Sequence, residues 1–506
     1  LYYAKMNGTF FVGSEIKAFL DHPNFKKELN KEALKPYMTF QYPVTQETFF
    51  KGVYRLPEGH YFTYKDGQFE MTQYWDENFE PEDETFDEAV NKIDDVVKNS
   101  VKAHTFADKG IKVGSFLSAG VDSSLVTALM RPDNTFSIGF DSTYDETKQA
   151  RELAAKMGLK NTDEKLTNEE AFHAFPMIQY YLDEPDSNPS VVPLYFLNKL
   201  AKDNGYKALL SGEGADELFA GYVNYGMHTH NDVIKVFTAG LKKLPKKSRV
   251  RLAHKIKKMP NFPGKVHMYT NLAEPSEFYV GQSVIYDMDY PTIFTSKDAN
   301  GILRDKYKND LTVNGIYQED FKKVKNIDEV KQMQYIDLHH FMLNDIEQKA
   351  DKISMAHSLE LRVPYLDKKI AELANSIPTK YLVNRHDTKY ALRKASEKVL
   401  PEEWAQRPKL GFPTPIKQWL KEPRFYKQVR ALFTEDFVDD IFDQKKIVKL
   451  LDDNYKGDGS ARRQIWAIYT FLVWYKLFFV DYDETVKKYQ HVQPEVAELI
   501  ESGRLV

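Results

Sequence analysis

The feature that most constrains the fold is an alternation of strand-like and helix-like segments between residues 86 and 211. The β-rich runs IKVGSFL (111–117), NTFSIGF (134–140) and YKALLS (206–211) lie among segments with helical spacing, which include DEAVNKIDDVVKNSV, SSLVTALM, KQARELAAKMG and PLYFLNKLAKDNG. Strands that alternate with helices pair in parallel, and the helices then cover both faces of the sheet. The sequence therefore predicts an α/β fold built on a parallel sheet.

Two regions of different character flank this core. Residues 1–76 contain short aromatic and β-branched runs broken by glycine and by a KDG turn, which favours β-hairpins. The acidic stretch DENFEPEDETF (76–86) has the composition of a linker, and the chain after about residue 226 is mostly helical. With 506 residues the chain is longer than a single hydrophobic core usually supports. We expect one unit at 1–76 and a larger one at 77–506.

Composition excludes several classes of partner. The 70 basic and 74 acidic residues leave a net charge of -4, so nothing global favours nucleic acid or an anionic membrane. The most apolar stretch, 465–480, is too short for a membrane span and is predicted to be a core helix. The lysine-rich segment 241–260 is predicted to be a solvated amphipathic helix pair. The absence of cysteine excludes disulfides and thiolate metal sites and indicates a cytoplasmic location.

A first small-residue elbow follows the strand IKVGSFL. Ser118, Ala119 and Gly120 leave room for a phosphate beside the backbone, and the N-terminus of the next helix adds partial positive charge. Hydroxyl donors come from Ser118, Ser123 and Ser124. Asp122 would repel a phosphate unless a cation lay between them, so the arrangement implies Mg²⁺. The alternative is a small-residue turn without function.

A second elbow, SGEGADE (211–217), follows the strand YKALL and carries Glu213, Asp216 and Glu217. Elbows at the carboxyl ends of neighbouring parallel strands would face one crevice, where open α/β sheets bind ligands. The alternative is a helix N-terminus whose acidic residues only favour the helix dipole.

These motifs carry a resemblance to a known family. SFLSAGVDSS resembles the pyrophosphate-binding loop, usually SGGxDSS, of adenylating PP-loop enzymes. The segments LSGEGADELFAGY, DKISMAHSLELRVPYLD, TKYALRKA and RPKLGFPTPIKQWL are, in this order, similar to the signatures of glutamine-hydrolysing asparagine synthetases. The opening LYYAKMNGTFFVGSEIKAFL resembles the end of that family's glutaminase domain, so the resemblance spans essentially the whole chain.

The resemblance implies a domain organisation. Residues 77–506 would form a Rossmann-like, adenine-nucleotide-binding synthetase domain with a helical C-terminal half. Residues 1–76 would be the C-terminal remnant of an N-terminal-nucleophile glutaminase domain with connecting hairpins. The family's nucleophile is a cysteine, and this sequence has none. We therefore expect a fragment of a longer amidotransferase that does not itself hydrolyse glutamine.

The resemblance also implies an activity. The family activates the side-chain carboxylate of aspartate with MgATP, releases pyrophosphate, and lets ammonia, normally from glutamine, convert the acyl-adenylate to asparagine. By this resemblance Glu213 would assist proton removal from ammonia, Lys389 would stabilise charge during adenylate formation, and Lys349 would face the phosphates. Asp122 and Asp216 would hold Mg²⁺. The ATP-binding residues would be Phe116, Leu117, Ser118, Ala119, Gly120, Asp122, Ser123, Ser124, Ile138, Ser211 and Gly212.

Alternatives remain open. The same chemistry could amidate another carboxylate, such as diaminopimelate in peptidoglycan precursors, or the chain could be a degenerate nucleotide-binding scaffold. Ala119 replaces the first glycine of the usual SGG, which would weaken nucleotide binding if that position required a positive φ. The sequence does not determine the oligomeric state, and a homodimer is one option.

Overall fold

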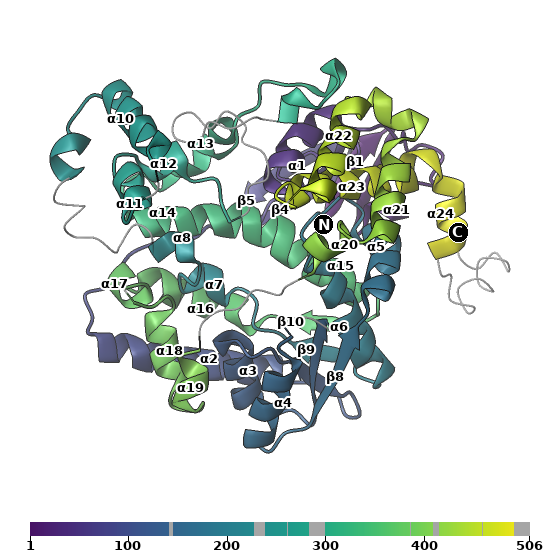
Figure 1. Ribbon diagram of the computed structural model, residues 1–506. Helices are drawn as coiled ribbons and strands as arrows, with labels where there is room; N and C mark the ends of the chain where they lie inside the picture. The colour runs from purple at the N-terminus through teal and green to yellow at the C-terminus, as the bar shows by residue number, and fades with distance from the viewer. Residues whose placement is uncertain are drawn as a thin grey trace.

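The structure is a computed structural model that describes residues 1–140, 145–226, 238–260, 262–282, 299–384, 386–407, 414–457 and 459–489. In Figure 1 the sheet of the α/β unit lies in the lower half of the molecule. The N-terminal region lies in the upper part, beside the C-terminal helices α22 (Gln444–Lys456) and α23 (Arg462–Tyr475).

A five-stranded parallel sheet confirms the predicted fold class. Its strands are β6 (Val113–Phe116), β7 (Thr135–Phe140), β8 (Asn161–Leu166), β9 (Ala208–Leu210) and β10 (Glu360–Arg362). They are arranged in the order β10-β9-β6-β7-β8, and every pair is parallel. The three strands expected from the sequence are β6, β7 and β9, while β8 and β10 extend the two edges. The first elbow follows β6 and the second follows β9, so the two lie side by side.

Helices cover both faces of this sheet, as parallel strands require. Alternation along β9 sends Leu209 into one hydrophobic core and Leu210 into the other. One core contains residues of α5, α6, α15 and α23, and the other contains residues of α2, α3 and α18. Helix α4 follows β7 in the chain. The bounds of the helices around the sheet are α2 Phe86–His104, α3 Val121–Met130, α4 Thr147–Lys156, α5 Asn168–Leu182, α6 Val191–Asp203, α15 Gln348–Met355 and α18 Tyr390–Ser396.

The N-terminal region is β-rich, as predicted. β1 (Tyr2–Met6) lies between β2 (Thr9–Gly13) and β3 (Val53–Arg55), and β4 (His60–Lys65) pairs with β5 (Gln68–Gln73). Asp66 and Gly67 have φ values of 54° and 77°, the left-handed conformation that a tight hairpin turn needs. Helix α1 (Leu34–Phe40) is buried throughout, and the Tyr37 hydroxyl donates to the carbonyl of Ala467 in α23 at 3.0 Å.

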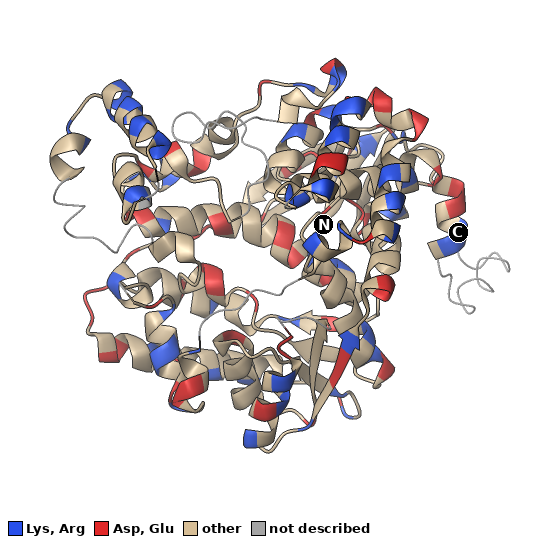
Figure 2. Cartoon of the chain, viewed as in Figure 1, with Lys and Arg blue, Asp and Glu red and all other residues tan. Residues whose placement is uncertain are grey.

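The C-terminal half is mostly helical, as predicted. Its helices include α10 Lys246–Lys258, α13 Val313–Lys323, α14 Glu329–Ile336, the π-helix η5 Asp337–Glu347, α16 Lys368–Ser376, α21 Pro423–Phe433 and α24 Tyr482–Tyr489. Helix α10 buries Ala253 and Ile256, while its lysines are exposed or partly exposed. Figure 2 shows that basic residues are frequent along this helix. Helix α23 is a buried core helix, as expected. Within the described ranges, no helix is long and apolar enough to cross a membrane.

The connecting stretch after β5 is irregular, as expected for a linker, but hydrogen bonds at Asp76 and Glu82 attach it to helices of the C-terminal half. Asp76 accepts hydrogen bonds from the Tyr335 hydroxyl at 3.0 Å and contacts His339 Nε2 at 3.0 Å. Further along, the N–H of Glu82 donates to the carbonyl of Ser376 at 2.8 Å. The linker therefore lies against α14 and α16, and its end forms the capping box that begins α2.

Candidate active site

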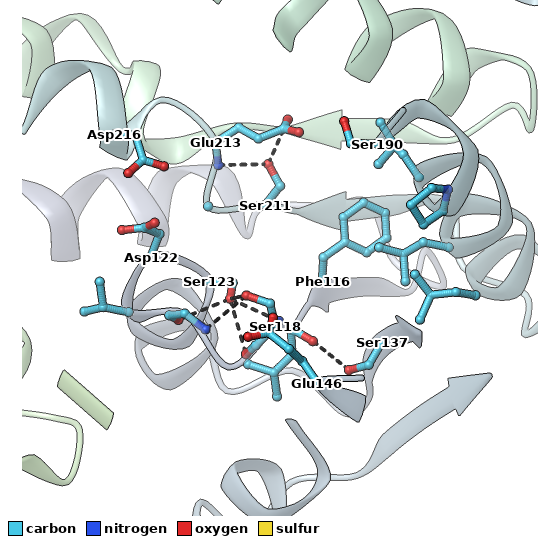
Figure 3. A pocket seen from close by; sticks show the side chains of 18 of the residues that line it. Phe116, Ser118, Asp122, Ser123, Ser137, Glu146, Ser190, Ser211, Glu213 and Asp216 are labelled. Carbon is cyan, nitrogen blue, oxygen red and sulfur yellow. Dashed lines mark hydrogen bonds between the residues drawn. The ribbon is translucent and has the colours of Figure 1, made fainter. Parts of the chain in front are cut away.

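The first elbow is a compact loop held by its own hydroxyl groups. The Ser118 N–H donates to Ser123 Oγ at 3.1 Å, and the two hydroxyls lie 2.9 Å apart. The N–H of Gly120 donates to Ser118 Oγ at 3.1 Å, and Gly120 is the N-cap of α3. Figure 3 shows these hydroxyls gathered at one wall of a cavity. Hydroxyls at a helix N-terminus are suited to an anionic ligand.

The backbone of the second elbow packs directly against the backbone of the first. A Cβ built on Gly212 would lie 2.6 Å from the N atom of Ser123 and 2.8 Å from the carbonyl carbon of Asp122. A side chain at Gly212 would therefore force the elbows apart. Gly214 has a φ of 86° and is the N-cap of α7 (Ala215–Leu218), which begins directly after the turn.

A cavity of about 420 Å³ lies between the two elbows. Most of the site residues expected from the sequence line it: Phe116, Leu117, Ser118, Gly120, Asp122, Ser123, Ile138, Ser211, Gly212, Glu213, Asp216, Lys349 and Lys389. These residues come from widely separated parts of the chain and are assembled by the sheet. Their individual roles stay predictions.

Two of the expected residues lie elsewhere. Ser124 is fully buried, and its hydroxyl donates to the carbonyl of Gly120 at 2.6 Å within the first turn of α3. Ala119 is 1% exposed and packs with Leu153 and Trp404 rather than lining the cavity. The φ of Ala119 is not positive, so its methyl group causes no backbone strain. The departure from SGG is therefore compatible with an intact loop.

One end of the cavity is apolar. The side chains of Phe116 and Ile138 are 7% and 6% exposed, and those of Pro193, Leu194 and Leu197 lie along the same cavity from α6. Ser137 donates its hydroxyl to the carbonyl of Leu117 at 2.6 Å and so ties β7 to the end of β6. An apolar slot with backbone groups at its rim is the kind of site that an adenine ring fits.

Two carboxylates converge on a buried ammonium group between the elbows. The Nζ atom of Lys389 lies 2.5 Å from Asp122 Oδ2 and 2.6 Å from Asp216 Oδ1. Lys389 is 2% exposed and has a φ of 55° just before α18. Burial alone would lower the pKa of Lys389, but the two carboxylates outweigh it and raise the pKa. The two carboxylates therefore favour the charged form of the lysine.

The donors present fit a magnesium ion shared with a nucleotide. Asp122 and Asp216 supply hard carboxylate oxygens close enough to share one cation. Among the described residues, no three His, Cys, Asp or Glu side chains form a metal cluster. Mg²⁺ that binds with phosphates needs only one or two protein carboxylates, so this pair matches that mode rather than an all-protein site.

Glu213 and Lys349 bring a carboxyl group and an ammonium group into the same cavity. Burial raises the pKa of Glu213 to about 7, with Lys349 opposing this rise and Glu217 adding to it. The Ser211 hydroxyl lies 3.4 Å from Glu213 Oε2. Lys349 is 3% exposed and donates to Asp345 Oδ1 at 2.9 Å. A carboxyl group that titrates near neutral pH can accept a proton during a reaction.

Several lining residues were missed from the sequence. Glu146 lies beside the first elbow, where burial raises its pKa while Arg407 and the N–H of Ala119 counteract the rise. The further polar lining residues are Ser137, Thr147, Asn188, Ser190, Tyr222 and Arg393. Most of them lie outside the two elbows, so an elbow motif could not indicate them. The histidines at 227–230 and residues 408–413 of the RPKLGFPTPIKQWL motif lie outside the described residues.

The sheet and its cavity define an α/β protein with a candidate ligand site at the carboxyl edge of a parallel sheet, where neighbouring strands end in two elbows. Residues 92–476 match the family described as Asparagine synthase, and residues 1–75 match a Glutamine amidotransferase domain. The chain belongs to the asparagine synthase family. Membership implies ATP-dependent amidation and a glutamine-hydrolysing type of ligase.

Similar proteins include two asparagine synthetases. The chain is 34% identical to the glutamine-hydrolysing asparagine synthetase 1 of Bacillus subtilis, over 94% of this chain and 73% of that protein. It is 22% identical to asparagine synthetase 3 of the same organism, over 96% of this chain and 76% of that protein. It is also 26% identical to the amidase chyE of Penicillium rubens, over 95% of this chain and 76% of that protein.

Proposed function

We propose that this chain converts aspartate to asparagine through an acyl-adenylate, using MgATP and ammonia that normally comes from glutamine. The observation that carries the proposal is one cavity lined by a hydroxyl-rich loop, by a pair of carboxylates bound to Lys389, and by Glu213 and Lys349. The cavity thus brings groups suited to a nucleotide together with a carboxyl group suited to proton transfer.

In the first step, the adenine would lie in the slot between Phe116 and Ile138, and the phosphates would reach Ser118 and Ser123. Asp122 and Asp216 would hold Mg²⁺, which would neutralise phosphate charge. A carboxylate oxygen of aspartate would attack the α-phosphorus as the bond to pyrophosphate breaks. Lys389, a buried cation beside both carboxylates, would stabilise the charge that develops there.

In the second step, ammonia would attack the acyl carbon of the adenylate, and AMP would leave with the electrons of the acyl–oxygen bond. The attacking nitrogen must lose a proton. Glu213 is the proposed acceptor because burial raises its pKa to about 7, close to the working pH of a general base. Lys349 lies next to this carboxylate and limits the rise.

The identity of the acceptor carboxylate is part of this proposal and not of the family assignment. The test is pyrophosphate release by the full chain with MgATP and ammonium chloride, in the presence of aspartate, a diaminopimelate-containing muropeptide, or no acceptor. Glutamine serves as a parallel nitrogen source. Aspartate-dependent release with formation of asparagine supports the proposal. Release only with the muropeptide would assign another acceptor, and ATP binding without release would favour the scaffold. The cytoplasmic location and the homodimer stay predictions.

A further inference from the structure

Gln41 holds an unusual backbone conformation in a buried position. It follows the last residue of α1, has a φ of 70°, and is 5% exposed. Glycine or asparagine is usual at this position of a helix end, because a longer side chain is strained there. Gln41 belongs to the part of the chain that matches the glutamine amidotransferase domain. A long amide side chain at this position needs a reason in the contacts that it makes.

The contacts of Gln41 reach the synthetase unit. Its backbone carbonyl accepts hydrogen bonds from the N–H of Ser187 at 2.9 Å and from the Ser187 hydroxyl at 3.2 Å. Its side-chain Nε2 donates to Asp345 Oδ2 at 3.0 Å. Both partners of the side-chain bond are buried, and Asp345 is fully excluded from solvent. Gln41 is thus fixed from both its backbone and its side chain.

The two carboxylate oxygens of Asp345 accept hydrogen bonds from different regions of the chain, one from the N-terminal region and the other from residues that line the cavity. While Oδ2 accepts from Gln41, Oδ1 accepts from Lys349 Nζ at 2.9 Å and from Asn188 Nδ2 at 2.7 Å. Lys349 and Asn188 both line the cavity. Rotation of the carboxylate would move both cavity groups, and the bond from Gln41 opposes that rotation.

We propose that Gln41 is a positioning residue through which the N-terminal region sets the place of the Lys349 ammonium group in the synthetase cavity. The hydrogen bonds of Gln41 lead through Asp345 to Lys349 and Asn188, so we expect Gln41 to act on the placement of Lys349. The functional consequence rests on the function proposed above, whereas the structural link between Gln41 and Lys349 can be tested independently of it.

The test compares Gln41→Leu and Gln41→Gly with the unaltered chain. The glycine variant removes the side chain and also relieves the left-handed backbone, so it remains folded if the leucine variant does not. Gln68→Leu, on the exposed strand β5 of the same region, is the matched control. Reductive methylation followed by mass spectrometry reports the accessibility of Lys349, with Lys389 as the internal reference. Calorimetry gives the affinity and stoichiometry for ATP.

We expect Lys349 to be methylated about tenfold faster in both Gln41 variants, while Lys389 keeps its rate. We expect ATP to bind with unchanged affinity and stoichiometry, and pyrophosphate release per bound ATP to fall about tenfold or more, because small misplacements of a reacting group are costly. A purely structural role would instead reduce the stoichiometry of ATP binding. Unchanged methylation of Lys349, or unchanged release despite faster methylation, would overturn the inference. If the unaltered chain releases no pyrophosphate with any acceptor, the proposed function fails, and the methylation rates still decide the role of Gln41.

Discussion

The ammonium group of Lys389 lies 2.5 Å from Oδ2 of Asp122, which is in the first turn of the helix that follows the first elbow. The same ammonium group also contacts Asp216 in the second elbow. One buried cation therefore joins three segments that are distant in the sequence. This ion pair network holds the two carboxylates together before any ligand binds.

Replacing Lys389 by methionine leaves the two carboxylates without their counter-charge. Unfolding free energy should fall by about 2–3 kcal/mol, less than for a fully buried pair, because Asp122 and Asp216 are 20% and 17% exposed. Pyrophosphate release should fall about a hundredfold or more. Magnesium chloride should raise the melting temperature of this variant more than that of the unaltered chain. The control is Lys394→Met, an exposed lysine on α18, the helix that follows Lys389. Equal losses in both variants would contradict the role given to Lys389.

Replacing Gly212 by alanine tests the contact between the elbows. The new methyl group would meet the backbone of Ser123 at 2.6 Å, so the elbows must separate. We expect a loss of about 1–3 kcal/mol in chemical denaturation and weaker ATP binding in calorimetry. Gly301→Ala is the control, because that glycine has open space around it and no positive φ. If Gly212→Ala binds ATP with normal affinity, the close approach of the elbows has no part in binding.

Restoring the usual glycine at position 119 should not improve the enzyme. Because Ala119 has no positive φ and is buried against Leu153 and Trp404, Ala119→Gly removes packing and adds backbone freedom. The two effects together should lower the unfolding free energy by about 1–2 kcal/mol. The affinity for ATP should not change. A large gain in affinity would show that alanine impairs the loop.

Glu213 gives the proposed amide-forming step its pH dependence. Burial raises its pKa to about 7, and only the ionised carboxylate can accept a proton. Asparagine formation, expressed per unprotonated ammonia, should rise with pH and level off above about 7. Glu213→Gln should abolish this rise with pH and lower asparagine formation much more than ATP binding. A pH profile that is unchanged in the variant would assign the proton to another group.

The same carboxyl group also affects stability. Its folded pKa lies above its ordinary value of 4.5, so the folded state binds the proton more tightly and stability falls as the pH rises from 4.5 to about 7. Glu213→Gln should therefore be more stable than the unaltered chain at about pH 8 and should lose this advantage in acid. Thermal unfolding measured across this range provides the check. A variant that is less stable at every pH would show that Glu213 is not destabilised by burial.

The sequence was most informative where local pattern and chemistry coincide. The strands β6, β7 and β9 are apolar and buried, and the elbows after β6 and β9 contain unusual sets of small and acidic residues. The edge strand β8 reads NTDEKL, which has no apolar periodicity, and β10 has three residues. Both strands are defined by their pairing with a neighbouring strand, and this pairing cannot be read from a single sequence. Helix α5 could have been found, because Thr167 and Glu170 form a capping box.

The candidate site shows the same division. The residues of the two elbows were predicted, because each elbow is a short local motif. The residues that hold other cavity groups in place were not, because they contact those groups across hundreds of positions in the sequence. Asp345 and Gln41 are 304 positions apart, and nothing in their local sequences indicates that they meet. The placement of Ser124 was also not predictable, because its hydroxyl can serve either a ligand or the carbonyl of Gly120 one turn earlier.

The central claim is that the acceptor carboxylate is activated by transfer of AMP. The most direct measurement supplies aspartate whose side-chain carboxylate carries a heavy oxygen isotope, together with MgATP and ammonium chloride, and analyses the products by mass spectrometry. The account predicts one labelled oxygen in AMP and the other in asparagine, with none in pyrophosphate. Label in inorganic phosphate with formation of ADP would contradict it, because the attack would then have occurred at the terminal phosphorus of ATP.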